Sequence, residues 1–83
     1  MGHRIGSAVT AYLIKQIREN PVNFIVFSII KWDLGVHVQI KSLKNTYGLF
    51  EVDDESDAEL LIHDVKGNLM QAYPEIQIQE ELL

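Results

Sequence analysis

The sequence contains no cysteine and only two prolines in 83 residues. Without cysteine the chain can form neither a disulfide nor a thiolate metal site, and it has no thiol nucleophile. Because small secreted domains usually depend on disulfides, this absence favours a reducing, cytoplasmic location. The five glycines are isolated from one another, which excludes a glycine-rich loop for binding phosphate.

Long hydrophobic runs are also missing. The longest nearly apolar stretch, Phe24 to Ile30, is much shorter than the ~20 residues that span a bilayer. The apolar positions between Ile5 and Ile17 lead into charged residues and a proline rather than into a signal-peptide cleavage site. We therefore expect one domain over residues 1–83, with residues 1–6 flexible and with no membrane partner.

Basic residues are scarce in the second part of the chain. Residues 1–50 contain six basic and two acidic residues, a net charge of +4, whereas residues 51–83 contain one basic and ten acidic residues, a net charge of −9. Together they give the formal net charge of −5. This asymmetry either polarises the surface of the domain, which would steer its association, or is neutralised when the two parts pack together.

The stretch from Val22 to Trp32 organises the rest of the chain. It is rich in β-branched and aromatic residues and contains neither glycine nor proline, so it predicts a strand. Alternate residues of a strand point to opposite faces. One face would carry Phe24, Val26, Ser28, Ile30 and Trp32, and the other would carry Ile25, Phe27 and Ile29 between Asn23 and Lys31. Because both faces are apolar, both must be covered.

Helical and strand patterns flank this stretch. Apolar residues at every fourth position up to Ile17 predict an amphipathic helix over residues 7–19, with Ser7 as its N-cap and Asn20-Pro21 as its end. After a turn at 33–35, alternation over residues 36–41 predicts a half-buried strand, and a third strand is expected over residues 47–52. Residues 75–79 alternate again and predict a short last strand at an edge of the sheet.

The segment from Ser56 to Tyr73 has two interpretations. Its apolar positions form one helical stripe behind a capping-box pattern, Ser56 with Glu59, which predicts a helix. Gly67 lies inside this stripe, where it costs ~1 kcal/mol relative to alanine, and residues 64–68 could instead form the turn of a β-hairpin. The helix accounts for more of the pattern. We therefore predict the order α-β-β-β-α-β, an α+β domain with two helices packed on an antiparallel or mixed sheet.

The acidic run from Glu51 to Glu59 is the conspicuous polar cluster of the sequence. Its alternating acids have the spacing of a calcium-binding loop, but Ala58 occupies the position at which an EF-hand loop needs glycine. Acids also suit the first turn of a helix because they complement its dipole. We therefore interpret the run as a solvated helix start without a metal, which could bind a basic partner through Asp53, Asp54, Glu55, Asp57 and Glu59.

The residue types that usually carry catalysis show no suitable spacing. His3, His37 and His63 share no metal-ligand spacing, and nothing in the sequence requires them to converge with carboxylates. The serines lack the sequence context of a nucleophile elbow. We therefore expect neither an enzymatic activity nor a cofactor.

The element order α-β-β-β-α over residues 7–73 resembles that of a double-stranded-RNA-binding domain. That family places lysines at the start of its second helix to bind phosphates. The corresponding residues here are Asp54, Glu55, Ser56 and Asp57, whose charge would repel a nucleic acid. The resemblance is limited to the element order, and direct nucleic-acid binding is not expected.

Two helices of this size can cover only one face of a four-stranded sheet, so the second face of the central strand needs another cover unless one helix crosses to it. We predict that a second copy of the chain supplies it, which makes the protein a non-enzymatic self-association module, at least a homodimer. The residues predicted to mediate this contact are those of one face of the strand, either Ile25, Phe27 and Ile29 or else Phe24, Val26 and Trp32.

Two other functions fit the same composition. One is an acidic inhibitor, similar only in size and acidity to immunity proteins, antitoxins and phage inhibitors, that blocks a basic nuclease or nucleic-acid-binding protein. The other is a small-molecule sensor with a pocket between the helices and the sheet.

Overall fold

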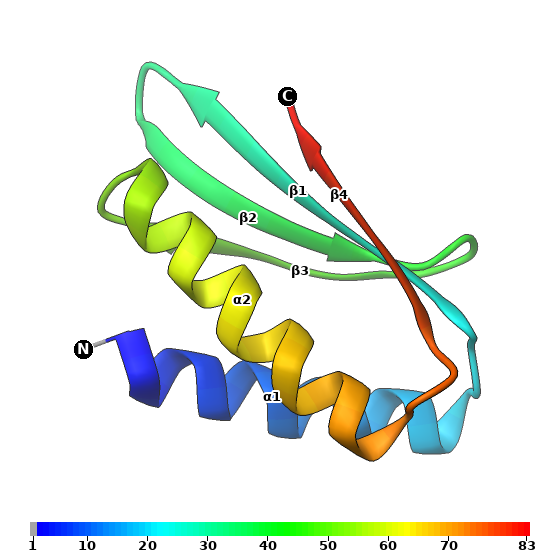
Figure 1. Cartoon of the computed structure of the whole chain (residues 1–83). Coiled ribbons are helices and arrows are strands. Elements are labelled where there is room, and N and C mark those ends of the chain that lie inside the picture. The colour runs from blue at the N-terminus through cyan, green and yellow to red at the C-terminus, as the bar shows by residue number, and fades with distance from the viewer. Residues whose placement is uncertain (1) are drawn as a thin grey trace.

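The computed structural model describes the backbone of residues 2–83 and the side chains of residues 6–83. The elements in chain order are α1 (Gly2–Glu19), β1 (Phe24–Trp32), β2 (Gly35–Lys41), β3 (Thr46–Val52), α2 (Glu55–Ala72) and β4 (Gln77–Leu82). This order confirms the predicted α-β-β-β-α-β arrangement (Figure 1). The domain is a single α+β unit with one sheet and two helices.

The sheet has four strands in the order β3-β2-β1-β4. β2 pairs antiparallel with both β1 and β3, whereas β4 pairs parallel with β1. The mixed sheet follows from the connections, because short turns join β1 to β2 and β2 to β3 while α2 carries the chain back before β4 begins. β1 therefore has neighbours on both sides, as its apolar sequence requires.

Both helices lie on the same side of the sheet and pack against each other (Figure 1). The core forms between them and one face of the sheet. Its members are Val9, Leu13 and Ile17 of α1, Ile25, Phe27 and Ile29 of β1, Val38 and Ile40 of β2, Ala58, Leu61, Ile62, Val65 and Leu69 of α2, and Ile76. Full burial of each large side chain contributes about 1.5–3 kcal/mol, so this single core carries most of the stability of the domain.

The first helix begins five residues earlier than predicted. Ser7 is not its N-cap but lies inside it, and residues 2–6, which were expected to be flexible, are helical. The carboxylate of Asp64 on α2 lies against Gly6, where no larger residue would leave it room. The Thr10 hydroxyl also donates a hydrogen bond to the Gly6 carbonyl over 2.7 Å. Met1 and the side chain of His3 lie outside the described part of the chain.

The second helix is continuous through Gly67, so the β-hairpin interpretation is wrong. Its N-cap is Asp54 rather than Ser56: the Asp54 carboxylate accepts a hydrogen bond from the backbone N–H of Asp57 over 2.9 Å. An aspartate is as good an N-cap as a serine, and with Asp54 as its cap the helix begins two residues earlier than predicted. At the other end the Tyr73 N–H donates to the Leu69 carbonyl over 2.8 Å.

The last strand runs from Gln77 to Leu82, later than the predicted 75–79. Ile76 is buried in the core before the strand begins, and the Gln77 N–H donates to the Asn23 carbonyl over 2.8 Å to start the pairing with β1. Neither α1 nor α2, which are the helices of residues 2–83, is long and apolar enough to cross a membrane.

Candidate functional site

The two faces of β1 have different surroundings. Ile25 and Phe27 are fully buried under the helices. The opposite face of the strand carries Phe24, Val26, Ser28, Ile30 and Trp32, and no helix or strand of residues 2–83 lies over it (Figure 1). We call this side of the sheet the open face. It is the candidate interaction surface.

The two alternative sets of residues predicted for self-association have different surroundings in the structure. Ile25, Phe27 and Ile29 belong to the core of their own chain, so a second copy has no access to them. Phe24, Val26 and Trp32 lie on the open face, and the register adds Ile30 to them. Sequence alternation defined the two sets but could not show which set the helices cover.

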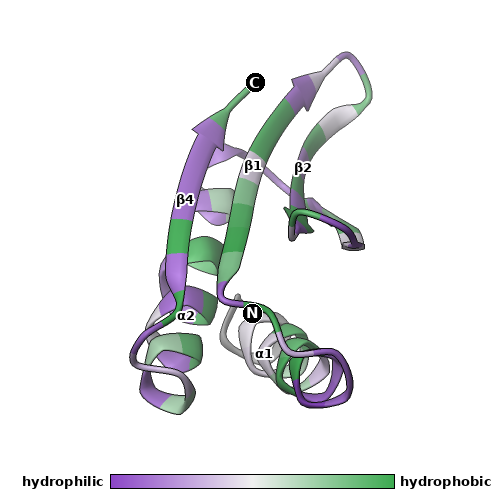
Figure 2. Ribbon diagram, turned by 90° about the vertical axis from the view of Figure 1, so that its right-hand side faces the viewer, coloured by the Kyte–Doolittle hydropathy of each residue, from purple (hydrophilic) through white to green (hydrophobic). Residues whose placement is uncertain are grey.

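Exposure varies along the open face. Trp32 is 53% exposed at one end, and Phe24 and Ile30 are half-buried. Val26 and Ser28 in the middle are buried although no element covers them. Their cross-strand neighbours are the long polar residues Lys41, Gln39, Gln79 and Glu81. The open face is thus an apolar strip along β1 between polar flanks, and Figure 2 shows the hydrophobic β1 beside the more hydrophilic β4.

Trp32 and His37 form a contact at the hairpin end of the open face. The Trp32 indole Nε1–H donates a hydrogen bond to His37 Nδ1 over 2.7 Å, and the two rings meet edge to face with centroids 5.3 Å apart. Because an indole N–H can only donate, Nδ1 must be the unprotonated nitrogen of a neutral imidazole. The sequence placed His37 on a wet strand face but gave no partner for it. The tight turn between β1 and β2 could have suggested one.

Two buried hydroxyl groups lack a hydrogen-bond partner among the described residues. One is Ser28 Oγ, at the centre of the open face. The other is Tyr47 Oη, on a residue that packs against the core. A buried hydroxyl without a partner is destabilising because it has lost its hydrogen bonds to water. The two faces of the sheet thus contain one such group each.

The acidic run is divided between structural roles and an exposed surface. Asp54 caps α2, and Glu55 forms an ion pair with Lys31 of β1 at 2.8 Å. Asp53 and Glu59 are exposed and Asp57 is half-buried. No three His, Asp or Glu side chains in the described part of the chain are placed to hold a metal ion.

The fold also brings in two acids that the sequence analysis did not group with this run. Glu80 and Glu81 of β4 lie beside Glu55 and Glu59 around a hollow of about 200 Å³ between α2 and β4. Ile29, Ile62 and Leu82 form the apolar part of its lining. Asp53, Asp54 and Asp57 do not line this hollow. Only the topology reveals this acidic hollow, because β4 is separated from the run by the whole of α2.

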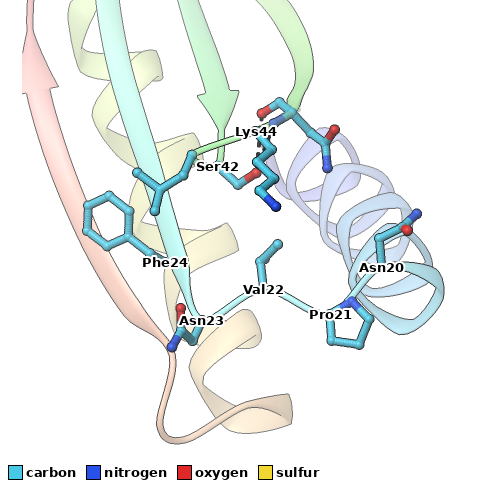
Figure 3. Close-up of a pocket in the computed structure, with 9 residues that line it drawn as sticks. Asn20, Pro21, Val22, Asn23, Phe24, Ser42 and Lys44 are labelled. Atoms are coloured by element: carbon cyan, nitrogen blue, oxygen red, sulfur yellow. Dashed lines mark hydrogen bonds between the residues drawn. The ribbon is translucent and has the colours of Figure 1, made fainter.

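A second hollow, of about 500 Å³, lies where the α1–β1 linker meets the β2–β3 turn. Pro21, Val22 and Phe24 line one side of it, and Ser42 and Lys44 line the other. The Lys44 side chain extends over it toward Val22 (Figure 3). This hollow, rather than the space between the helices and the sheet, which the core fills, is where a small molecule could enter.

Comparisons of this chain with protein-family models, with curated proteins and with solved structures found no significant match. The functional argument therefore depends on the surfaces described above.

Proposed function

We propose that the protein is a non-enzymatic interaction module that self-associates through the open face of its sheet. The observation that supports this is the uncovered apolar strip of β1, in which Phe24, Ile30 and Trp32 keep accessible surface. An apolar sheet face that no helix of the domain covers is a common binding surface. A sheet face of this kind packs readily on a second sheet at ~10 Å.

The flanks of the open face suit the edge of such an interface. Lys41 and Gln39 on one side and Gln79 and Glu81 on the other are long, polar and flexible. An interface typically has an apolar centre and a polar, partly hydrated rim. When a second copy docks, these side chains can move outward and expose the buried Val26 to the partner.

The first test compares Ile30→Lys with Leu60→Lys. Both substitutions place a lysine at an accessible apolar position, but Ile30 lies on the open face and Leu60, 63% exposed, lies on α2. We expect the wild-type protein and Leu60→Lys to have the mass of a dimer or a larger species by light scattering on a sizing column, at low and at high salt. We expect Ile30→Lys to be a folded monomer, because a charge in the centre of the interface would be desolvated without a partner.

Circular dichroism shows whether Ile30→Lys has kept its fold, which it should, since Ile30 is half-buried on the open face and does not belong to the core. A wild-type protein that is monomeric at every concentration would refute self-association. So would an Ile30→Lys protein that keeps its full oligomeric mass.

A second function, docking of a basic partner, is favoured by the acidic hollow between α2 and β4. The carboxylates of Glu55, Glu59 and Glu80 surround an apolar floor there, which is the chemistry that a segment with alternating basic and apolar residues would recognise. Two lysines partly neutralise the site: Lys31 pairs with Glu55, and Lys66 pairs with Glu80 at 2.9 Å. Glu59 has no such ion pair among the described residues, so it is the expected contact; Glu81 borders the hollow, but its cross-strand partner Ser28 places it on the open face.

The test uses a synthetic peptide of alternating lysine and leucine as the probe. Changing Glu59 to glutamine should weaken its binding, and the loss should shrink as salt is raised. Changing Asp53 to asparagine removes the same charge away from the hollow and is the control. Equal losses from the two variants would show only a general charge effect, and the hollow would then not be the docking site.

A further inference from the structure

We propose that His37 makes association through the open face sensitive to pH. The inference rests on the proposed function, since it assigns a regulator to the same surface. In its neutral form His37 accepts the hydrogen bond of Trp32, and this contact keeps the end of the open face ready to be covered. When His37 takes up a proton, the contact is lost and association weakens.

The geometry leaves little choice about the protonation state. Trp32 Nε1 carries a hydrogen and can only donate, and it lies 2.7 Å from His37 Nδ1. A proton on Nδ1 would place two donors face to face at hydrogen-bond distance. The two side chains must then separate, so the contact between them exists only while the imidazole is neutral at that nitrogen. Histidine is the side chain whose charge usually changes between pH 5 and 8.

The neighbours of His37 supply a second position for the charged ring. On β1 its cross-strand partner is Ile30, which is uncharged, and on β3 its partner is Glu51. Lys31 points to the other face of β1, where it pairs with Glu55. Neither α1 nor α2 lies over the open face. Glu51 is therefore the charged group that faces His37, and an imidazolium would turn from Trp32 toward the Glu51 carboxylate.

The movement of the His37 ring from Trp32 to Glu51 changes the surface that a second copy would cover. With His37 neutral, the indole N–H already has an acceptor, so Trp32 can be buried without an unpaired donor. With His37 charged, covering Trp32 would leave its N–H without a partner and would also desolvate an imidazolium at the interface. The charged form thus favours the free monomer, and by linkage association favours the neutral form.

The first readout is the fluorescence of Trp32, the single tryptophan of the chain. In protein diluted until it is monomeric, we expect the emission at about pH 5.5 to differ from that at about pH 7.5, because the indole loses its acceptor when His37 is protonated. His37→Gln keeps a side chain that can accept a hydrogen bond but does not titrate, and it should abolish the change. His63→Gln, at an exposed position on α2, is the matched control and should leave the change intact.

The second readout is the dissociation constant of the dimer. Between about pH 7.5 and about pH 5.5 we expect it to rise about tenfold for the wild type and for His63→Gln, as for the loss of a buried hydrogen bond, and to stay constant for His37→Gln. Circular dichroism at both pH values shows that the fold is retained.

The outcomes separate the two proposals. A wild-type protein that stays monomeric at every pH refutes the proposed function, and the regulation that depends on it, whatever the fluorescence shows. A dimer whose dissociation constant does not change with pH, or whose pH dependence persists in His37→Gln, refutes the regulation by His37 and leaves self-association standing.

Discussion

The two faces of β1 are almost equally apolar, yet they have opposite fates in the fold. Ile25 is fully buried under the helices, whereas Ile30, five residues along the same strand, is half-buried on a face that no helix covers. The difference lies in the crossover: α2 returns on the same side of the sheet as α1. An apolar strand face thus shows that a cover is needed, and the topology decides whether the chain provides it.

The largest expected effect is a loss of stability that depends on the face. Ile25→Ala removes the same atoms as Ile30→Ala, but from a closed core instead of an open surface. We expect Ile25→Ala to lower the free energy of unfolding by about 3–4 kcal/mol, since it leaves a cavity, and Ile30→Ala to lower it by about 1 kcal/mol. Urea unfolding in dilute, monomeric protein measures both.

The effects of these two substitutions on the dissociation constant of the dimer should rank in the opposite order. Ile30→Ala should raise the dissociation constant of the dimer, whereas Ile25→Ala should change it little wherever the protein stays folded. Equal losses of stability from both variants would mean that the open face is packed as tightly as the core, and the contrast between the faces would then be wrong.

The sequence predicted the elements and their order well because the spacing of apolar residues and the residue composition of a segment depend only on that segment. The alternation of residues 36–41, the apolar stripe of α2 and the two-sided strand all have direct counterparts in the structure. The ends of the helices were less predictable because they depend on contacts. Asp54 and Ser56 are both good N-cap residues, and the first helix packs at Gly6 against Asp64, more than fifty residues away along the chain.

The candidate surfaces were predictable only in part, for the same reason. The acidic run was evident, but its contact with Glu80 and Glu81 requires β4 to lie beside β1. Alternation assigned the two candidate sets for self-association to opposite faces of β1, but only the position of the helices shows which set is covered. The acids of β4 are likewise divided in a way that the sequence does not show: Glu80 lies with Glu55 and Glu59 near the start of α2, whereas Glu81 also lines a hollow with Lys41 and Lys44.

The two buried hydroxyl groups, one on each face of the sheet, should give a smaller change in the free energy of unfolding when they are removed. Tyr47→Phe and Ser28→Ala each remove a hydroxyl that has no partner among the described residues. Each should raise the free energy of unfolding of the monomer by about 1 kcal/mol, because an unpaired polar group no longer has to leave water on folding. Thermal and urea unfolding of dilute protein test this expectation.

Association distinguishes these two variants. Tyr47 packs against the core, so Tyr47→Phe should leave the dimer unchanged. Ser28 lies at the centre of the open face, where a second copy, directly or through water, can supply the missing partner. If Ser28→Ala destabilises the monomer, its hydroxyl has a partner within the chain, and it then reports nothing about the interface.

The smallest expected effect concerns Lys31, the last residue of β1 on the helix side of the sheet. It reaches Glu55 in the first turn of α2 at 2.8 Å, but the two side chains are 50% and 39% exposed. Water and salt screen such a pair, so a double-mutant cycle with Lys31→Met and Glu55→Gln should give a coupling energy of about 0.5 kcal/mol that fades at high salt. A coupling several times larger would mean that this pair holds α2 against the sheet. The start of α2 would then be held on the sheet by an ion pair rather than by the apolar packing that distinguishes the core face from the open face.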